Sequence, residues 1–124
     1  MGKRKILLID DEVAFTEMLK LNLESDGVYD VIIENNSSKA VDTALAHKPD
    51  LIFLDIIMPG MEGPDVAMAI QSNSELRNIP IVFLTATITK EEVDLQDGTI
   101  GGQPFVAKPA DLPTLRKAIK DNIK

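Results

Sequence analysis

Short apolar runs along this chain alternate with longer segments in which apolar residues recur every three or four positions. The runs are rich in β-branched residues and lack regular polar positions, a pattern typical of strands that are buried on both faces of a parallel sheet. We predict five such strands, at residues 5–9, 29–33, 51–54, 81–84 and 105–107, of which the last has the weakest pattern.

The apolar residues at helical spacing predict helices within residues 15–23, 40–45, 65–70 and 112–123. Gly27 is suited to end the first helix, and Ser37 or Ser38 is suited to cap the second. Pro113 fits the first turn of the last helix, where its missing N–H costs little. Residues 90–104 are acidic and rich in glycine, so the helix expected between the last two strands has the least regular pattern.

Strand and helix therefore alternate five times, which predicts an α/β fold of the (βα)5 type. Because crossovers between parallel strands are right-handed, we expect an open, doubly wound five-stranded parallel sheet with helices on both faces. At 124 residues, with 44% hydrophobic and 27% charged residues, the chain fits a single globular domain over residues 1–124. In such sheets, ligands bind outside the carboxyl ends of the strands.

Composition and charge narrow the classes of function. The chain has no cysteine, which excludes disulfides, thiol nucleophiles and cysteine metal sites. A net charge of −7 and an aromatic content of 4% argue against direct nucleic-acid binding. No apolar run approaches the ~20 residues of a membrane span or the length of a secretory signal, so we expect a cytoplasmic protein that does not contact the membrane.

Polar and charged residues stand directly behind four of the predicted strands. Asp10 and Asp11 follow the first strand, Asp55 the third, Thr85 the fourth and Lys108 the fifth. The carboxyl ends of parallel strands lie at one edge of the sheet, so we expect three carboxylates, a hydroxyl and an ammonium group to meet there. Taken separately, each of these residues also fits a plain structural role, such as a solvated turn or a helix cap.

Three carboxylates in one crevice repel one another unless a cation lies among them. A site made of oxygen ligands suits Mg²⁺, which can also bridge to phosphoryl oxygens. Asp55 stands in the middle as the natural nucleophile, because a carboxylate can carry a phosphoryl group as an aspartyl phosphate. Thr85 and Lys108 can contact the phosphoryl oxygens, and before phosphorylation we expect Lys108 to face Asp55. His47, the only histidine, lies away from these strand ends, which excludes a histidine-based triad.

Four motifs resemble the receiver domain of two-component response regulators, and together they cover essentially the whole chain. They are I-L-L-I-D-D-E (residues 6–12), L-I-F-L-D-I-I-M-P-G-M-E-G (51–63), F-L-T-A (83–86) and F-V-A-K-P (105–109). The resemblance implies a flavodoxin-like fold with strand order 2-1-3-4-5. It also implies a signalling switch that is not an enzyme in the usual sense, because it promotes only its own phosphorylation and dephosphorylation.

The same resemblance implies roles for the acidic residues. Asp55 would accept a phosphoryl group from a phosphohistidine of a sensor histidine kinase or a histidine phosphotransfer protein. Mg²⁺ would be the cofactor, bound by Asp11, Asp55 and the backbone carbonyl of Ile57, with Asp10 acting largely through water.

The resemblance implies further roles at the last two strand ends. Thr85 and Lys108 would bind the phosphoryl oxygens, and the Lys108–Pro109 peptide is expected to be cis. Phe105 matches the aromatic switch position, where tyrosine is more usual, so it has no hydroxyl to donate when it turns inward.

Two positions tune the lifetime of the aspartyl phosphate in this family, and here they hold Ile57 and Thr87. Neither carries an acidic, amide or basic group that could direct an attacking water. We therefore expect a comparatively long-lived phosphoryl state.

The resemblance also implies a downstream protein partner. Its binding face would be built by the fourth helix, the fifth strand and the last helix. Candidate contact residues are Val93, Leu95, Phe105, Arg116 and Lys120. The oligomeric state stays open, with a phosphorylation-linked dimer as one alternative, and the receiver either stands alone or belongs to a larger regulator or hybrid kinase.

Three other functions fit the sequence less well. A Mg²⁺-dependent phosphohydrolase acting through an aspartyl phosphate commonly has a second acid two residues after the nucleophile, where this chain has Ile57. A flavin-binding module of similar fold would need a phosphate loop rich in serine, threonine and glycine after the first strand, where this chain has D-D-E-V-A. A degenerate receiver that only binds partners is disfavoured, because the full residue set is present.

Overall fold

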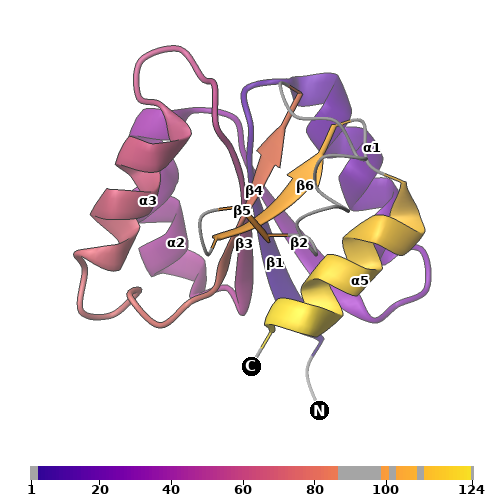
Figure 1. Cartoon of the computed structure of the whole chain (residues 1–124). Helices are drawn as coiled ribbons and strands as arrows, with labels where there is room; N and C mark the ends of the chain where they lie inside the picture. The colour runs from indigo at the N-terminus through magenta and orange to yellow at the C-terminus, as the bar shows by residue number, and fades with distance from the viewer. Residues whose placement is uncertain (1–2, 87–98, 101–102, 109–110, 124) are drawn as a thin grey trace.

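The chain folds into a parallel sheet with helices on both faces (Figure 1). The computed structural model describes residues 3–86, 99–100, 103–108 and 111–123. The strands are β1 (Arg4–Ile9), β2 (Tyr29–Glu34), β3 (Leu51–Asp55), β4 (Ile81–Thr85), β5 (Thr99–Ile100) and β6 (Gln103–Ala107). The sheet order is β2-β1-β3-β4-β6-β5, and all neighbours except the last pair are parallel. The predicted parallel sheet of order 2-1-3-4-5 is confirmed, with β6 as its fifth strand.

The sheet also holds a strand that the sequence pattern did not predict. β5 pairs antiparallel with β6, so that Thr99 lies opposite Pro104 and Ile100 opposite Gln103. A two-residue strand is too short to show a hydrophobic period, and it exists only through this hairpin pairing. Residues 87–98, where much of the fourth helix was expected, lie outside the described residues.

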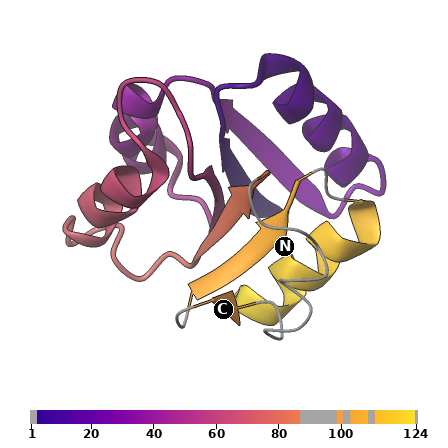
Figure 2. The same ribbon diagram turned by 45° about the horizontal axis from the view of Figure 1, so that its top comes forward.

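Helices cover both faces of the sheet, as Figures 1 and 2 show. A separate cluster of buried apolar side chains packs on each face. The helices are α1 (Val13–Glu24), α2 (Ala40–His47), α3 (Gly63–Gln71) and α5 (Leu112–Asn122). Leu7 and Ile9 of β1 pack with α2 and α3, whereas Ile6 and Leu8 pack with α1 and α5. This alternation follows from the two-residue period of a strand. All five residues of β3 and all five of β4 are buried, as expected for central strands.

The cap before α2 differs from the prediction. A short 3-10 turn, η1 (Ser37–Lys39), precedes the helix, and its cap is Asn36, whose side-chain oxygen accepts a hydrogen bond from the Ser38 N–H at 3.0 Å. Neither Ser37 nor Ser38 is therefore the cap. Asn and Ser suit a cap about equally well, so chemistry alone could not choose among neighbouring candidates.

The other helix ends agree with their local chemistry. α1 ends at Glu24, and Gly27 takes a φ of +76° shortly after it, as expected for a glycine that follows a helix. Pro113 lies in the first turn of α5 as predicted, and Asp111 caps that helix by accepting the Thr114 N–H at 2.9 Å. In the described part of the chain, none of the helices has the length and apolar character needed to cross a bilayer.

Gly63 fixes how closely α3 approaches the end of β3. Its N–H donates to the Ile56 carbonyl oxygen at 2.8 Å. A Cβ atom at this position would overlap the Asp55 carbonyl oxygen and lie 2.7 Å from the Cα of Ile56. Only glycine lets the loop between β3 and α3 close this tightly behind Asp55.

We expect Gly63→Ala to lower the free energy of unfolding by about 1–3 kcal/mol, because the methyl group must displace backbone atoms at the end of β3. Urea unfolding of the purified variant measures this loss. Met68→Ala is the matched control on the same helix, because Met68 is 68% exposed. Equal stability of Gly63→Ala and the wild type would contradict the close approach.

Candidate functional site

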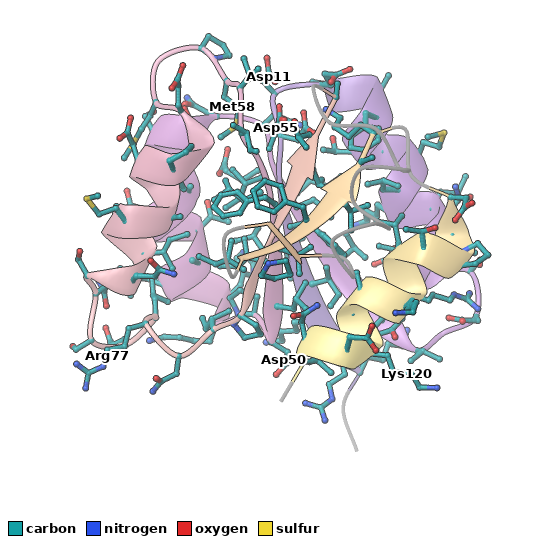
Figure 3. All side chains as sticks on the ribbon, in the orientation of Figure 1. Asp11, Asp50, Asp55, Met58, Arg77 and Lys120 are labelled. Atoms are coloured by element: carbon teal, nitrogen blue, oxygen red, sulfur yellow. The ribbon has the colours of Figure 1, made fainter. Side chains whose placement is uncertain are left out.

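The carboxyl ends of four parallel strands meet at one edge of the sheet. Asp10 directly follows β1, Asp55 is the last residue of β3, Thr85 is the last of β4 and Lys108 directly follows β6. Backbone pairing continues past the strand ends: the Lys108 N–H donates to the Thr85 carbonyl oxygen at 2.8 Å. In Figure 3, Asp11 and Asp55 lie at this end of the molecule, and Asp50, which precedes β3, lies at the opposite end.

Three carboxylates come together at this edge, as the strand-end rule predicts. One oxygen from each of Asp10, Asp11 and Asp55 lies within 4.8 Å of the others. Asp10 is fully buried and Asp55 is 5% exposed, whereas Asp11 is open to solvent. The cluster thus has a buried floor of two acids and one acid at its mouth.

Lys108 lies at the same edge, but its closest partners differ from the expected one. Its Nζ is 2.9 Å from Asp10 Oδ2 and 2.5 Å from Glu12 Oε1, and it is 3.9 Å from Asp55 Oδ2. The ammonium group also lies 4.5 Å from the centre of the Phe15 ring, within reach of a cation–π interaction. Lys108 was expected to face Asp55 and is held mainly by Asp10 and Glu12.

Burial and the neighbouring charges shift the pKa values at this edge. Burial, together with the charge of Asp10, raises the pKa of Asp55 to about 6 against the pull of Lys108. Burial also raises the pKa of Asp10, although the hydrogen bond from Lys108 opposes it. For Lys108, burial works to lower the pKa, but hydrogen bonds to Glu12 and Asp10 outweigh it and raise the pKa. In all three groups burial disfavours the charged form, and for Asp55 the charge of Asp10 adds to that effect.

The donor set is therefore compatible with a divalent cation. Carboxylate oxygens are the ligands that Mg²⁺ prefers, and an added cation would oppose the burial and the repulsion from Asp10 that together raise the pKa of Asp55. Ile57, the residue expected to add a backbone carbonyl, lies two positions after Asp55 and is 58% exposed. The Ile57 backbone works to lower the pKa of Asp55.

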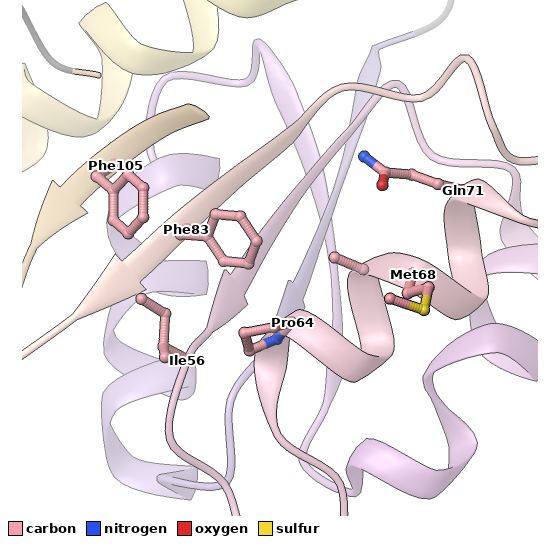
Figure 4. A pocket seen from close by; sticks show the side chains of 7 residues that line it. Ile56, Pro64, Met68, Gln71, Phe83 and Phe105 are labelled. Carbon is pink, nitrogen blue, oxygen red and sulfur yellow. The ribbon is translucent and has the colours of Figure 1, made fainter. Parts of the chain in front are cut away.

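Thr85 and Phe105 lie on the two strands that flank the site. Thr85 is 1% exposed at the end of β4. The Phe105 ring in β6 is half-buried, and its centre lies 5.2 Å from that of Phe83. Both rings line an open, largely apolar pocket of about 340 Å³ against α3, shown in Figure 4. Its lining residues are Ile56, Pro64, Ala67, Met68, Gln71, Phe83 and Phe105.

Several other predicted positions lie elsewhere. Pro109, Thr87, Val93 and Leu95 fall outside the described residues, so the expected cis peptide at Pro109 and two of the five expected output residues lie outside them too. The two remaining output residues are on α5: Lys120 is exposed, and Arg116 pairs with Asp26, which follows α1, at 2.5 Å. The guanidinium of Arg116 therefore turns toward α1.

A supporting network behind the acids was missed by the sequence interpretation. The Asn35 side chain donates to the Asp10 carbonyl oxygen at 2.8 Å and to the Thr16 hydroxyl at 3.0 Å, and Thr16 is fully buried. Ser37 is buried and joins the loop after β3, because its hydroxyl donates to the Pro59 carbonyl oxygen at 3.2 Å. Asn35 and Ser37 follow β2, so the strand-end rule applied to the second strand would have found both, whereas Thr16 lies in α1.

We expect Asp55→Asn to stabilise the metal-free protein at neutral pH. The folded-state pKa of Asp55, about 6, lies above its ordinary value of 3.8, so the folded state binds this proton more tightly than the unfolded state does. The ionised carboxylate therefore lowers the free energy of unfolding by its full amount above about pH 6. This loss disappears below the ordinary pKa of an aspartate side chain. Replacing it should raise the free energy of unfolding by about 1–3 kcal/mol at about pH 7.5.

Urea unfolding in the presence of a chelator measures this gain, which should shrink at about pH 4.5. Asp42→Asn is the control, because Asp42 is an exposed acid in the first turn of α2 and its loss should not stabilise the protein. A loss of stability in Asp55→Asn at neutral pH, or a gain that does not depend on pH, would contradict the expected charge repulsion.

Known proteins share the fold of this chain. The family model for the response regulator receiver domain matches residues 6–120. The chemotaxis protein CheY4 of Vibrio cholerae is 27% identical, with a TM-score of 0.81 over 97% of this chain and 98% of its own. A response regulator from Desulfuromonas acetoxidans is 30% identical, with a TM-score of 0.78 over 95% of this chain and 94% of its own. The signal receiver domain of a DNA-binding response regulator from Colwellia psychrerythraea 34H is also 30% identical, with a TM-score of 0.77 over 96% of this chain and 97% of its own. The chain belongs to the family of response regulator receiver domains.

Proposed function

We propose that this receiver domain is a phosphorylation-dependent switch of a two-component phosphorelay, with Asp55 as its phosphoacceptor. The supporting observation is the meeting of three carboxylates and the nearly buried Lys108 at one sheet edge, with Asp55 among them. With a pKa of about 6, the Asp55 carboxylate is mostly ionised at neutral pH and can act as a nucleophile.

In the proposed reaction, an Asp55 carboxylate oxygen attacks the phosphorus atom of a phosphohistidine on a sensor histidine kinase or phosphotransfer protein. A P–O bond forms to Asp55, the P–N bond breaks, and the imidazole leaves with the electron pair and takes up a proton. Lys108 is close enough to place its ammonium group on a phosphoryl oxygen after a small movement, since it lies 3.9 Å from Asp55. The Thr85 hydroxyl is proposed to donate to a second phosphoryl oxygen.

Mg²⁺ is the proposed cofactor. Asp11, Asp55 and the backbone carbonyl of Ile57 would hold it directly, and Asp10 would act through water. The ion would supply positive charge to the phosphoryl oxygens. Asp10 is better suited to the indirect role, because it is fully buried and already accepts hydrogen bonds from Lys108 and the Glu12 N–H.

The proposed output surface lies on β6 and α5, with Phe105 and Lys120 among its described residues. Phosphorylation would bias Phe105 between packing against Phe83 and a second arrangement, and a downstream protein would recognise the difference. We further propose that residues 1–124 form one receiver domain that works in the cytoplasm without binding nucleic acid or membrane. A phosphohydrolase is disfavoured, because the apolar Ile57 side chain stands where a general acid would be needed.

Incubation with acetyl phosphate and Mg²⁺ should add one phosphoryl group to the purified protein, as detected by intact mass. Asp55→Asn should abolish the adduct, because an amide cannot form the aspartyl phosphate. Asp65→Asn is the matched control, since Asp65 is an exposed acid in the first turn of α3 and should leave the adduct unchanged.

Chelation of the metal should also prevent the adduct, because the phosphoryl charge would then meet the three carboxylates unscreened. An adduct that survives Asp55→Asn would overturn the assignment of the phosphoacceptor. An adduct that forms equally well with a chelator would overturn the assignment of Mg²⁺.

We expect the phosphorylated protein to persist for minutes or longer at room temperature. The Ile57 side chain is exposed beside Asp55 and has no group that can direct a water molecule. Ile57→Asn supplies such a group and should speed hydrolysis by about ten-fold, as followed by loss of the mass adduct. Met68→Asn, a similar change at an exposed apolar position on α3, should leave the lifetime unchanged. A wild-type half-life of seconds would refute this prediction.

A further inference from the structure

The partner of Lys108 that lies closest is a residue to which the proposed reaction assigns no role. Glu12 Oε1 is 2.5 Å from the Lys108 Nζ, whereas Asp55 Oδ2 is 3.9 Å away. The ammonium group has three N–H donors, and two of its near partners are the carboxylates of Glu12 and Asp10. Of the three carboxylates around the ammonium group, Asp55 is therefore the one that it contacts least closely.

Glu12 and Asp10 hold the lysine in different ways. The Asp10 side chain is completely buried, so breaking its contact with Lys108 would leave a buried carboxylate without its charge partner. The Glu12 side chain is 61% exposed, so it can turn into solvent at little cost. Of these two contacts, the one to Glu12 is the easier to release.

The backbone allows this release without disturbing α1. The Glu12 side chain makes no capping hydrogen bond to the helix, and the Glu12 N–H donates to Asp10 Oδ1 at 3.0 Å. The main chain at the helix start is therefore fixed by Asp10, and the Glu12 carboxylate is free to move around it. Its main described contact is the one with Lys108.

We propose that Glu12 is a positioning residue that holds Lys108 away from Asp55 in the unphosphorylated protein and slows phosphoryl acceptance. This inference rests on the proposed function of Asp55. A phosphoryl group on Asp55 brings negative charge to the site and competes with Glu12 for the same ammonium group. Lys108 then leaves Glu12, whose carboxylate becomes solvated at the start of α1.

The test compares rates of adduct formation with acetyl phosphate at saturating Mg²⁺. Glu12→Gln keeps the shape of the side chain and removes its charge, and we expect the rate to rise about three-fold, as suits the loss of a partly exposed ion pair. Glu62→Gln is the matched control, because Glu62 is an exposed acid just before α3 and makes no side-chain cap hydrogen bond. Glu62→Gln makes the same change in net charge as Glu12→Gln, and its rate of adduct formation should be close to that of the wild type.

A second readout follows the lysine itself by NMR of its side-chain methylene next to Nζ, assigned with Lys108→Arg. In unphosphorylated Glu12→Gln this resonance should already be displaced toward its position in the phosphorylated wild type. A change that only loosened the structure would lower the unfolding midpoint instead, and we expect that midpoint to stay unchanged.

The outcomes separate this inference from the function on which it rests. A wild-type adduct with no acceleration in Glu12→Gln, an equal acceleration in Glu62→Gln, or an unmoved Lys108 resonance overturns the role of Glu12 and leaves Asp55 as phosphoacceptor. Failure of the wild type to form any adduct overturns both.

Discussion

The ion pair between Lys108 and the buried Asp10 is the interaction on which the rest of the site depends. It joins the end of β6 to the end of β1 across 98 positions of sequence, at an Nζ–Oδ2 distance of 2.9 Å. Asp10 has no exposed surface, so its charge is tolerable only with such a partner. Its other carboxylate oxygen accepts the Glu12 N–H, so the same side chain also fixes the start of α1. Without Lys108 the carboxylates of Asp10 and Asp55 would be buried near each other without this ion pair.

Burial divides the site into a fixed floor and a rim that can exchange partners. Asp10, Asp55 and Thr85 form the floor, each nearly inaccessible to solvent and attached to the end of a central strand. Asp11 and Glu12 form the rim and are exposed. Electrostatic interactions are strong on the floor and weakly screened there, whereas rim contacts can break at little cost. The buried carboxylates of the floor therefore keep their partners, and changes of partner occur among the exposed residues of the rim.

The arrangement of strands was predictable because each central strand is apolar on both faces and the rule for parallel crossovers leaves few topologies. The same rule brought Asp10, Asp55 and Lys108 to one edge before any coordinates were known. The Glu12 contact was not predictable, because it joins side chains 96 positions apart whose rotamers depend on the finished site. β5 was not predicted because a strand of two residues is too short to show a hydrophobic period. The Asn36 cap was not predicted because the neighbouring serines are equally suitable caps.

The same geometry limits which movements at the site could be transmitted to the rest of the domain. The Lys108 N–H is bonded to the Thr85 carbonyl oxygen at 2.8 Å, so the backbones of β4 and β6 are tied together where both proposed phosphoryl contacts begin. A movement of Lys108 toward Asp55 must then occur in its side chain. Phe105, three residues earlier in β6, has no hydroxyl with which to gain a hydrogen bond, so the two arrangements proposed for it would differ only in packing against Phe83 and the pocket on α3. Packing differences of this kind amount to about 1 kcal/mol, so the proposed switch would need a partner protein that favours one arrangement in order to be complete.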